Sequence, residues 1–130
     1  MMFYDQEKRR RYDIKMNVEQ ALNIVKQSLE TYIGTPSINA LQLFINGFLY
    51  NNLSYRNYPI DECFMWGFHD WARRKIEEGK GIIFDLDVGY DDYIEAVCEN
   101  GEQEIALFFE LCEEFFEEMR NFKLIDGDIT

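Results

Sequence analysis

Apolar side chains recur every three or four residues along most of this 130-residue chain, which is the spacing of one face of an α-helix. The pattern is clearest over residues 105–122, where aromatic residues form a broad stripe and glutamates fill the positions between them. We expect a helix here, with the stripe in the core and the glutamates in solvent. The stripe consists of Ile105, Phe108, Phe109, Cys112, Phe115, Phe116, Met119 and Phe122.

Two helices are predicted in the first half of the chain from their capping residues. Asn17 and Gln20 stand at the spacing of a capping box, and the apolar pattern that follows them runs to Gly34, where a helix would end. Thr35 and Pro36 then predict the start of a second helix, because threonine is a good N-cap and proline is favoured at the first helical position.

A third helix is predicted to begin at Pro59 and Asp61 and to end at Gly79. Trp71 lies beside the apolar face of this helix, whereas Trp66 lies off that face. The face itself is formed by Phe64, Met65, Phe68, Ala72 and Ile76.

Residues 50–59 separate the second and third helices and are predicted to form a loop. Their mixture of tyrosine, asparagine, serine and arginine is typical of adaptable binding loops, which makes Tyr55 and Tyr58 candidate partner contacts. The alternative is that these tyrosines pack against the core.

Residues 81–98 are the most ambiguous part of the pattern. The apolar run from Gly81 to Gly89 permits a short buried strand, but no partner strand is evident, which favours helix or irregular structure. Asp91 and Asp92 then start a short helix that Asn100 and Gly101 terminate.

These elements predict a mainly α fold, a compact bundle of four to five helices, with one short strand near residues 82–87 as the alternative for that segment. The length is close to the commonest domain size, and 47% of the residues are apolar, so residues 1–130 are expected to form a single acidic helical domain. We expect residues 1–16 and 123–130 to be flexible at its ends.

The cysteines and the N-terminus indicate the compartment. Three widely spaced cysteines do not form a disulfide framework, which favours a reducing environment. No stretch has the length and apolarity of a membrane span, and the first residues do not resemble a signal peptide. The sequence therefore predicts a cytoplasmic protein that does not bind membranes.

The net charge of −12 is distributed unevenly. The last fifty residues hold fifteen acidic and two basic side chains, whereas the first eighty residues are close to neutral. Such a field repels nucleic acid and attracts basic partners, so direct nucleic-acid binding is not expected. The alternative is that the acidic residues only keep an aromatic-rich protein soluble.

Two motifs invite a catalytic or calcium-binding interpretation, and both fail on spacing. Residues 82–87 resemble the DxD signature of haloacid-dehalogenase-type phosphatases, but only 43 residues follow Asp87, too few for the rest of that α/β fold. An EF-hand loop counted from Asp85 would need glycine at position six and glutamate at position twelve. The sequence has Tyr90 and Ala96 there, which leaves at most an irregular cation site.

The only histidine, His69, does not by itself predict a metal or catalytic site. One histidine cannot build a zinc site alone, and the cysteines lack ligand spacing. Cys63 lies six residues before His69, a separation that does not place the two on one helix face. The sequence therefore predicts no enzyme, no cofactor, no metal ion and no catalytic residue.

Three segments together resemble a group of small bacterial proteins that look like immunity proteins of polymorphic-toxin and contact-dependent inhibition systems. The resemblance implies a cytoplasmic inhibitor that binds a toxin domain, and it assigns no functional residue. It is carried by Tyr32–Ile38 with Ala40, Leu41 and Phe44–Leu49, by Phe68–Trp71, and by Ala106–Leu111 with Glu114 and Phe115.

The functional hypothesis is that this protein is a stoichiometric inhibitor of a basic, nuclease-type toxin domain. Electrostatic steering would speed its association with the toxin domain, and aromatic anchors would slow the dissociation. The alternatives are a small regulatory or adaptor protein and a phage-type nucleic-acid mimic. A further alternative for the main candidate patch is that Asp91 and Asp92 only cap a helix while Tyr93 is buried. The candidate contacts are Asp85, Asp87, Tyr90, Asp91, Asp92, Tyr93 and Glu95, together with Tyr55 and Tyr58.

Overall fold

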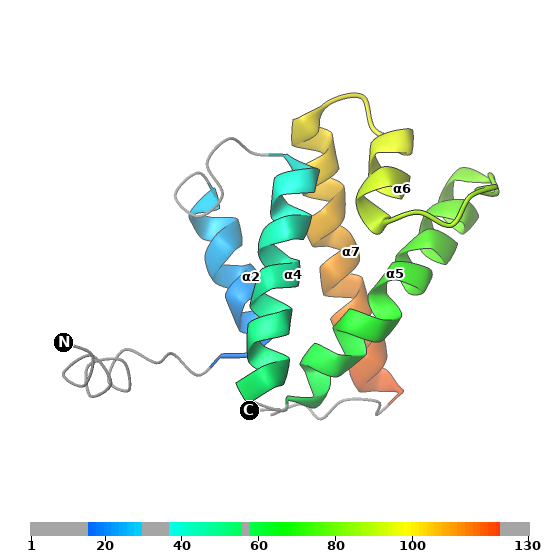
Figure 1. The fold of residues 1–130 in the computed structure, drawn as a ribbon. Helices are drawn as coiled ribbons and strands as arrows, with labels where there is room; N and C mark the ends of the chain where they lie inside the picture. Colours follow the sequence, from blue (N-terminus) through cyan, green and yellow to red (C-terminus); the bar gives the residue numbers. More distant parts are fainter. Residues whose placement is uncertain (1–15, 30–36, 56–57, 123–130) are drawn as a thin grey trace, which may run out of the picture.

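The computed structural model describes residues 16–29, 37–55 and 58–122, and within these ranges it is a bundle of five helices (Figure 1). The prediction of a mainly α fold is confirmed. The short strand near residues 82–87 is not formed, because that segment has irregular backbone. The helices are α2 (Val18–Gln27), α4 (Ile38–Tyr55), α5 (Pro59–Lys80), α6 (Tyr90–Val97) and α7 (Gly101–Asn121).

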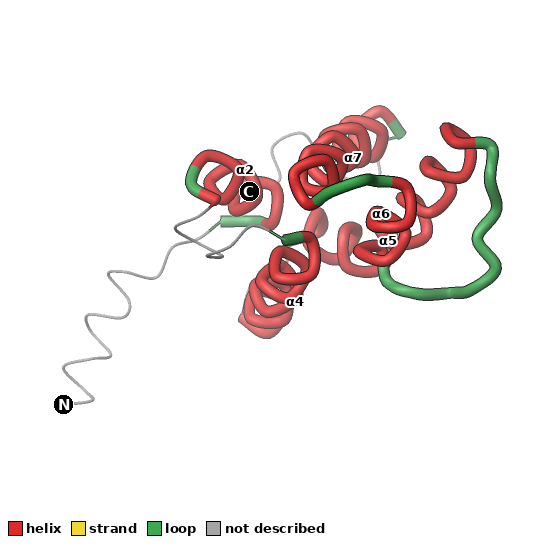
Figure 2. The backbone as a smooth tube through the Cα atoms, turned by 90° about the horizontal axis from the view of Figure 1, so that it is seen from above, coloured by secondary structure: helices red, strands yellow, loops and turns green. Residues whose placement is uncertain are grey.

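The four longer helices lie side by side, and the short helix α6 contacts α4, α5 and α7 (Figure 2). Helix α2 contacts α4 and α5. Ion pairs also link α2 to α7, one between Lys26 and Glu113 and another between Glu19 and Arg120. The loop that joins α5 to α6, residues 81–89, runs along the outside of the bundle in both views.

The predicted capping box at the start of α2 is confirmed. The Asn17 side chain accepts a hydrogen bond from the Gln20 backbone N–H at 2.9 Å, and the Gln20 side chain accepts one from the Asn17 backbone N–H at 2.9 Å. The predicted end is wrong, because α2 ends at Gln27 with Ser28 as its C-cap. Gly34 lies outside the described residues.

The start of α4 differs from the prediction in its capping residue. The Ser37 hydroxyl accepts a hydrogen bond from the Ala40 backbone N–H at 3.0 Å, which is the N-cap arrangement. The helix begins at Ile38, so serine has the role predicted for Thr35. Thr35 and Pro36 themselves lie outside the described residues.

The predicted loop over residues 50–59 is wrong over most of its length, because α4 continues to Tyr55. The Asn52 side chain is buried and donates hydrogen bonds to the Asp61 carboxylate and the Met16 carbonyl, both at 2.8 Å. The composition of this polar segment favours a loop, but hydrogen bonds to residues distant in sequence keep it helical.

Helix α5 begins at Pro59 as predicted but continues past Gly79 to Lys80. Gly81 terminates it in the left-handed conformation, with φ of 68°, and its N–H donates to the Glu77 carbonyl at 2.9 Å. Gly81 is the residue that needs glycine's conformational freedom here.

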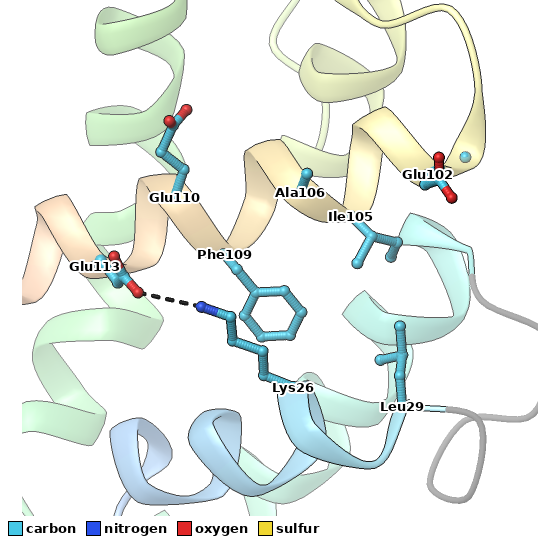
Figure 3. Close-up of a pocket in the computed structure, with 9 residues that line it drawn as sticks. Lys26, Leu29, Glu102, Ile105, Ala106, Phe109, Glu110 and Glu113 are labelled. Atoms are coloured by element: carbon cyan, nitrogen blue, oxygen red, sulfur yellow. Dashed lines mark hydrogen bonds and ion pairs between the residues drawn. The ribbon is translucent and has the colours of Figure 1, made fainter.

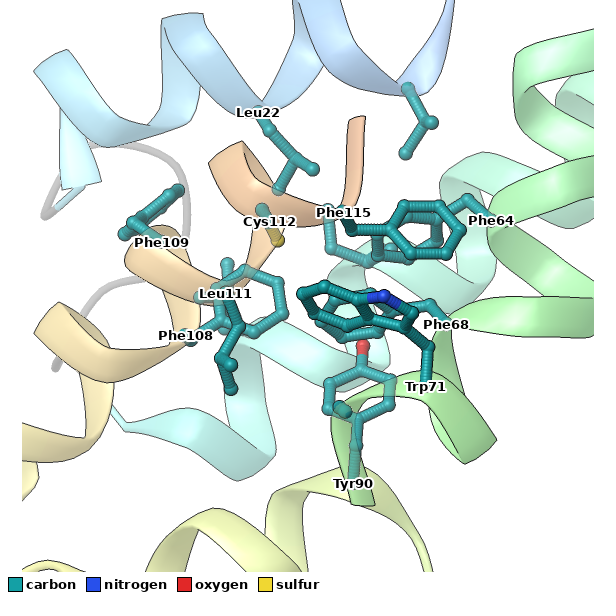
Figure 4. Packing of buried hydrophobic residues seen from close by; sticks show 14 of the residues in the cluster. Leu22, Phe64, Phe68, Trp71, Tyr90, Phe108, Phe109, Leu111, Cys112 and Phe115 are labelled. Atoms are coloured by element: carbon teal, nitrogen blue, oxygen red, sulfur yellow. The ribbon is translucent and has the colours of Figure 1, made fainter. Parts of the chain in front are cut away.

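An aromatic cluster from α5, α6 and α7 forms the centre of the core (Figure 4). Phe68 stacks on Phe64 with ring centroids 4.5 Å apart, and Phe108, Phe115 and Tyr90 meet it edge-on at 5.9, 5.4 and 5.1 Å. The predicted aromatic stripe of α7 is buried from Ile105 to Met119, and its last member, Phe122, is exposed.

A buried carboxylate links the N-terminus of α2 to α4 and α5. Asp61 is fully buried and accepts hydrogen bonds from the Val18 backbone N–H at 2.7 Å and from Asn52 at 2.8 Å. Burial raises the Asp61 pKa above its ordinary value, and these two hydrogen bonds oppose the rise. Asp61 is thus a core residue as well as a residue of the first turn of α5.

Candidate protein-binding surface

The backbone of the 81–89 loop is attached to α5 through Phe84. Arg73 donates from Nη2 to the Phe84 carbonyl at 2.6 Å, and the Phe84 N–H donates to Glu77 Oε2 at 2.9 Å. Arg73 also donates from Nε to Glu77 Oε2 at 3.2 Å. The Phe84 N–H and then Arg73 lower the Glu77 pKa, which shows that its charged form is the one favoured here.

Tyr93 of α6 holds the second half of the loop. Its hydroxyl accepts from the Val88 N–H at 3.1 Å and donates to the Leu86 carbonyl at 3.2 Å, and its ring centroid lies 4.5 Å from that of Phe84. The Tyr93 side chain is buried. The loop is therefore irregular in secondary structure, but side chains from two helices hold its backbone at several points.

This attachment turns Phe84 towards the core and leaves two aliphatic side chains in solvent. Ile83 is 82% exposed and Leu86 is 70% exposed, and the neighbouring Ile82 is also exposed. Asp85, which lies between Ile83 and Leu86 in the sequence, and Asp87, which follows Leu86, are also exposed. Together Ile82, Ile83, Asp85, Leu86 and Asp87 form a surface that we call the loop ridge.

Tyr90 and Tyr93 do not face solvent, so the expectation that they act as exposed aromatic anchors is wrong. Both belong to the inner face of α6, because residues three and four apart on a helix share a face and Ile94 and Val97 continue that face. Burial raises the Tyr90 pKa far above its ordinary value, and its hydroxyl has no hydrogen-bond partner among the described residues.

The predicted acidic residues near the ridge divide into exposed and engaged groups. Asp85, Asp87, Asp92 and Glu95 are exposed, whereas Asp91 is half-buried and accepts a hydrogen bond from Asn39 at 2.6 Å. Partial desolvation, followed by repulsion from nearby carboxylates, raises the pKa of Glu95 although its side chain is largely exposed. Of these residues, Asp85 and Asp87 lie directly beside the exposed aliphatic residues of the ridge, whereas Asp91, Asp92 and Glu95 belong to α6.

The second predicted patch, Tyr55 and Tyr58, does not join the first. Tyr58 is half-buried against the core, and its carbonyl accepts hydrogen bonds from the Asp61 and Glu62 N–H groups at 3.0 and 3.3 Å. The Tyr55 side chain lies outside what the structure describes. Tyr58 immediately precedes α5, and Asp87 of the ridge lies 3.2 Å from His69 in the middle of that helix, so about 16 Å of helix separates the two patches.

A groove between α2 and α7 is a second surface feature, and sequence reasoning missed it (Figure 3). Its volume is about 770 Å³, and Leu29, Ile105, Ala106 and Phe109 supply its apolar lining. Lys26 pairs with Glu113 at 3.3 Å and lies over the Phe109 ring. Glu102, Glu110 and Glu113 make its rim acidic. No local motif could indicate it, since it depends on how two distant helices are placed.

The cysteines offer little as nucleophiles. Cys63 and Cys98 are half-buried and Cys112 is buried, and all three are free thiols. Burial raises the pKa of each thiol, which disfavours the reactive thiolate.

Comparisons with known proteins found no similar chain. No protein-family model matches the sequence, and no curated protein or solved structure matches it either. Across residues 16–29, 37–55 and 58–122, no helix combines the length and apolar character that crossing a lipid bilayer requires.

Proposed function

We propose that this protein is a stoichiometric protein-binding inhibitor, an immunity-type protein that acts without a catalytic step in the cytoplasm on a basic, nuclease-type toxin domain. The observation that carries the proposal is the loop ridge, in which exposed Ile83 and Leu86 alternate with exposed aspartates on a backbone held by α5 and α6. The resemblance of the sequence to immunity proteins supports the same class of partner.

The ridge has the two features that make a small contact surface bind well. Ile83 and Leu86 can be buried by a partner and so supply apolar anchors at the centre of the contact. Because Arg73, Glu77 and Tyr93 already hold the loop, little conformational entropy remains to be lost on binding.

The charges around the ridge select the kind of partner. Asp85 and Asp87 are exposed within the ridge, Asp92 and Glu95 are exposed on α6, and the whole chain carries −12. A basic partner is therefore attracted over distances of about 10 Å at ordinary salt, whereas nucleic acid and acidic proteins are repelled. A nuclease domain is basic where it binds its substrate, so an acidic inhibitor can cover that surface.

The proposal is tested by affinity capture of the tagged, full chain from its host, with mass spectrometry of the bound proteins. We expect one basic protein at equal stoichiometry on the wild type and its loss with the pair Ile83→Ser and Leu86→Ser. Leu43→Ser on α4 is the matched control, since Leu43 is 72% exposed and lies on a helix outside the ridge. Capture of the same protein by the ridge variant, or of no basic protein at all, would reject the proposal.

The groove between α2 and α7 favours a second candidate function, an adaptor that receives a basic amphipathic helix. Its apolar lining and acidic rim fit the apolar face and the flanking lysines or arginines of such a helix. Ala106 lines the groove and is exposed, so the long side chain of Ala106→Arg would fill the groove. Loss of the captured protein with Ala106→Arg, together with its retention by the ridge variant, would favour the adaptor function.

A further inference from the structure

Three side chains of types that can ligate metals come together where the end of the loop ridge lies against α5. His69 and Asp70 belong to α5, and Asp87 belongs to the loop. The His69 Nε2 atom lies 3.2 Å from Asp87 Oδ1, and one ligand atom from each of the three residues lies within 4.8 Å of the others. The two aspartates are exposed and the histidine is half-buried, so the cluster opens to solvent on one side.

The contact between His69 and Asp87 is close but does not form a hydrogen bond. The Nε2 atom is shielded from solvent and has no hydrogen-bond partner among the described residues, although the carboxylate oxygen is within 3.2 Å. Two ligands of one tetrahedral zinc ion, each about 2.0–2.2 Å from the metal, lie about 3.3 Å apart, and the line between them misses the nitrogen lone pair. The distance and the alignment of this ion-pair contact are therefore also compatible with two ligands of one shared ion.

We propose that His69, Asp70 and Asp87 bind a divalent metal ion of the zinc type, with water completing its coordination. One imidazole and two carboxylates suit Zn²⁺ or Co²⁺ better than Mg²⁺, which prefers ligands that are all oxygen. The two carboxylates balance the charge of the ion. This site stands independently of any partner, although a bound ion would attach the loop to α5 at one more point.

The surroundings of the three residues fit this role. The Tyr93 hydroxyl lies 3.4 Å from Asp87 Oδ1, and the Tyr93 ring meets the His69 ring edge-on with centroids 5.4 Å apart, which orients both ligands. Arg73 is the nearby cation that competes for Asp87, but its guanidinium already donates to Glu77 and to the Phe84 carbonyl. Asp87 accepts a hydrogen bond from the Tyr93 hydroxyl through Oδ1 and keeps further lone pairs for an ion.

The test is a titration of the untagged, chelator-treated full chain with ZnCl₂, followed by NMR and calorimetry. His69 is the only histidine in the chain, so its ring signals report the site directly. We expect one-to-one binding with a shift of these ring signals, visible absorption bands when Co²⁺ replaces Zn²⁺, and no response to MgCl₂ at the same concentration.

Variants separate this site from general attraction of cations to an acidic protein. His69→Gln and Asp87→Asn should each weaken Zn²⁺ binding at least about ten-fold. Asp85→Asn, an exposed neighbour in the same loop, should leave binding unchanged. A variant with Cys63→Ser and Cys98→Ser should also bind as the wild type does, which excludes the two half-buried thiols as ligands. No binding, or binding that is equal in His69→Gln and the wild type, would overturn the proposal.

Discussion

The aromatic core and the loop ridge use similar apolar residues in opposite ways. In the core, Phe64, Phe68 and Phe115 bury their rings against one another because helical spacing places them on facing stripes. In the ridge, Phe84 turns inward while Ile83 and Leu86 remain in solvent. The core is explained by local periodicity, whereas the ridge depends on contacts made by residues of α5 and α6 that are distant in sequence.

This difference separates the residues that stabilise the fold from the residues that we propose bind a partner. Buried aromatic residues each contribute several kcal/mol to folding, whereas an exposed aliphatic side chain contributes little. The loop backbone is nevertheless fixed by hydrogen bonds at Phe84, Leu86 and Val88. A segment that is fixed in position yet keeps its apolar side chains in water is better explained by a binding role than by folding.

The largest effect is expected in the core. Phe68→Ala removes a buried ring that contacts five other aromatic rings, so the free energy of unfolding should fall by about 3–5 kcal/mol. Urea unfolding followed by circular dichroism measures this. Trp66→Ala is the control, because Trp66 is 75% exposed on the same helix and its loss should change stability by less than about 0.5 kcal/mol. Equal losses in the two variants would contradict the core assignment.

The next effect concerns the buried carboxylate. Asp61→Asn keeps an acceptor for the Val18 N–H but places an amide N–H₂ opposite that of Asn52, which should cost about 1–3 kcal/mol.

The same variant tests the pH dependence. Because burial raises the Asp61 pKa in the folded state, the folded protein binds this proton more tightly, and wild-type stability falls as pH rises from about 4 through the raised pKa. The stability difference between wild type and Asp61→Asn should therefore shrink over that range. A difference that grows with pH would show that the Asp61 pKa is lowered.

A smaller and local effect is expected in the loop. Arg73→Gln removes the donor to the Phe84 carbonyl, so the Phe84 and Val88 amides should exchange with solvent about ten-fold faster while the amides of α7 keep their protection. Native-state hydrogen exchange by NMR measures this. Arg74→Gln, a change in the exposed neighbouring residue, should leave the loop amides unaffected. Uniform acceleration across all helices would mean that Arg73 supports the whole fold instead of the loop.

The smallest effect on stability is expected for the exposed acids. Asp85→Asn with Asp92→Asn should leave the free energy of unfolding within about 0.5 kcal/mol of the wild type, because both side chains are exposed. Association with a basic partner should nevertheless slow and lose part of its salt dependence, as stopped-flow measurements at several salt concentrations would show. If the double variant associated at the wild-type rate at every salt concentration, these aspartates would contribute to solubility and not to binding.

Sequence reasoning predicted the elements that local chemistry determines. The capping box of Asn17 and Gln20, the start of α5 at Pro59 and the buried stripe of α7 are all confirmed. The capping box and the α7 stripe depend on residues three or four apart, whose side chains are neighbours on a helix whatever the rest of the chain does. The start of α5 depends on a proline at the first helical position.

The errors arose where distant residues decide the structure. The C-terminal part of α4 was predicted to be a loop because its composition is polar, and Asn52 is held in the helix by Asp61 and the Met16 carbonyl. Tyr90 and Tyr93 were expected at the surface because acidic residues surround them in sequence.

The cluster around His69 and the groove between α2 and α7 could not be predicted from local sequence patterns either. Asp87 is eighteen residues from His69, so their contact follows from the path of the loop. The groove needs α2 beside α7, whose sequence separation is larger still. The acidic part of the proposed interface could be named from sequence. The two apolar residues that we propose as its anchors could not, because the outward direction of Ile83 and Leu86 depends on Arg73, Glu77 and Tyr93.

The most direct test of the account is the affinity of the captured partner for purified ridge and control variants, measured by calorimetry at fixed salt. If Ile83 and Leu86 are the anchors, the pair Ile83→Ser and Leu86→Ser should weaken binding at least about 100-fold, since hot-spot residues contribute about 2 kcal/mol or more each. Leu43→Ser should bind within about two-fold of the wild type. Equal affinity of the ridge variant and the wild type would contradict the claim that this loop is the binding surface.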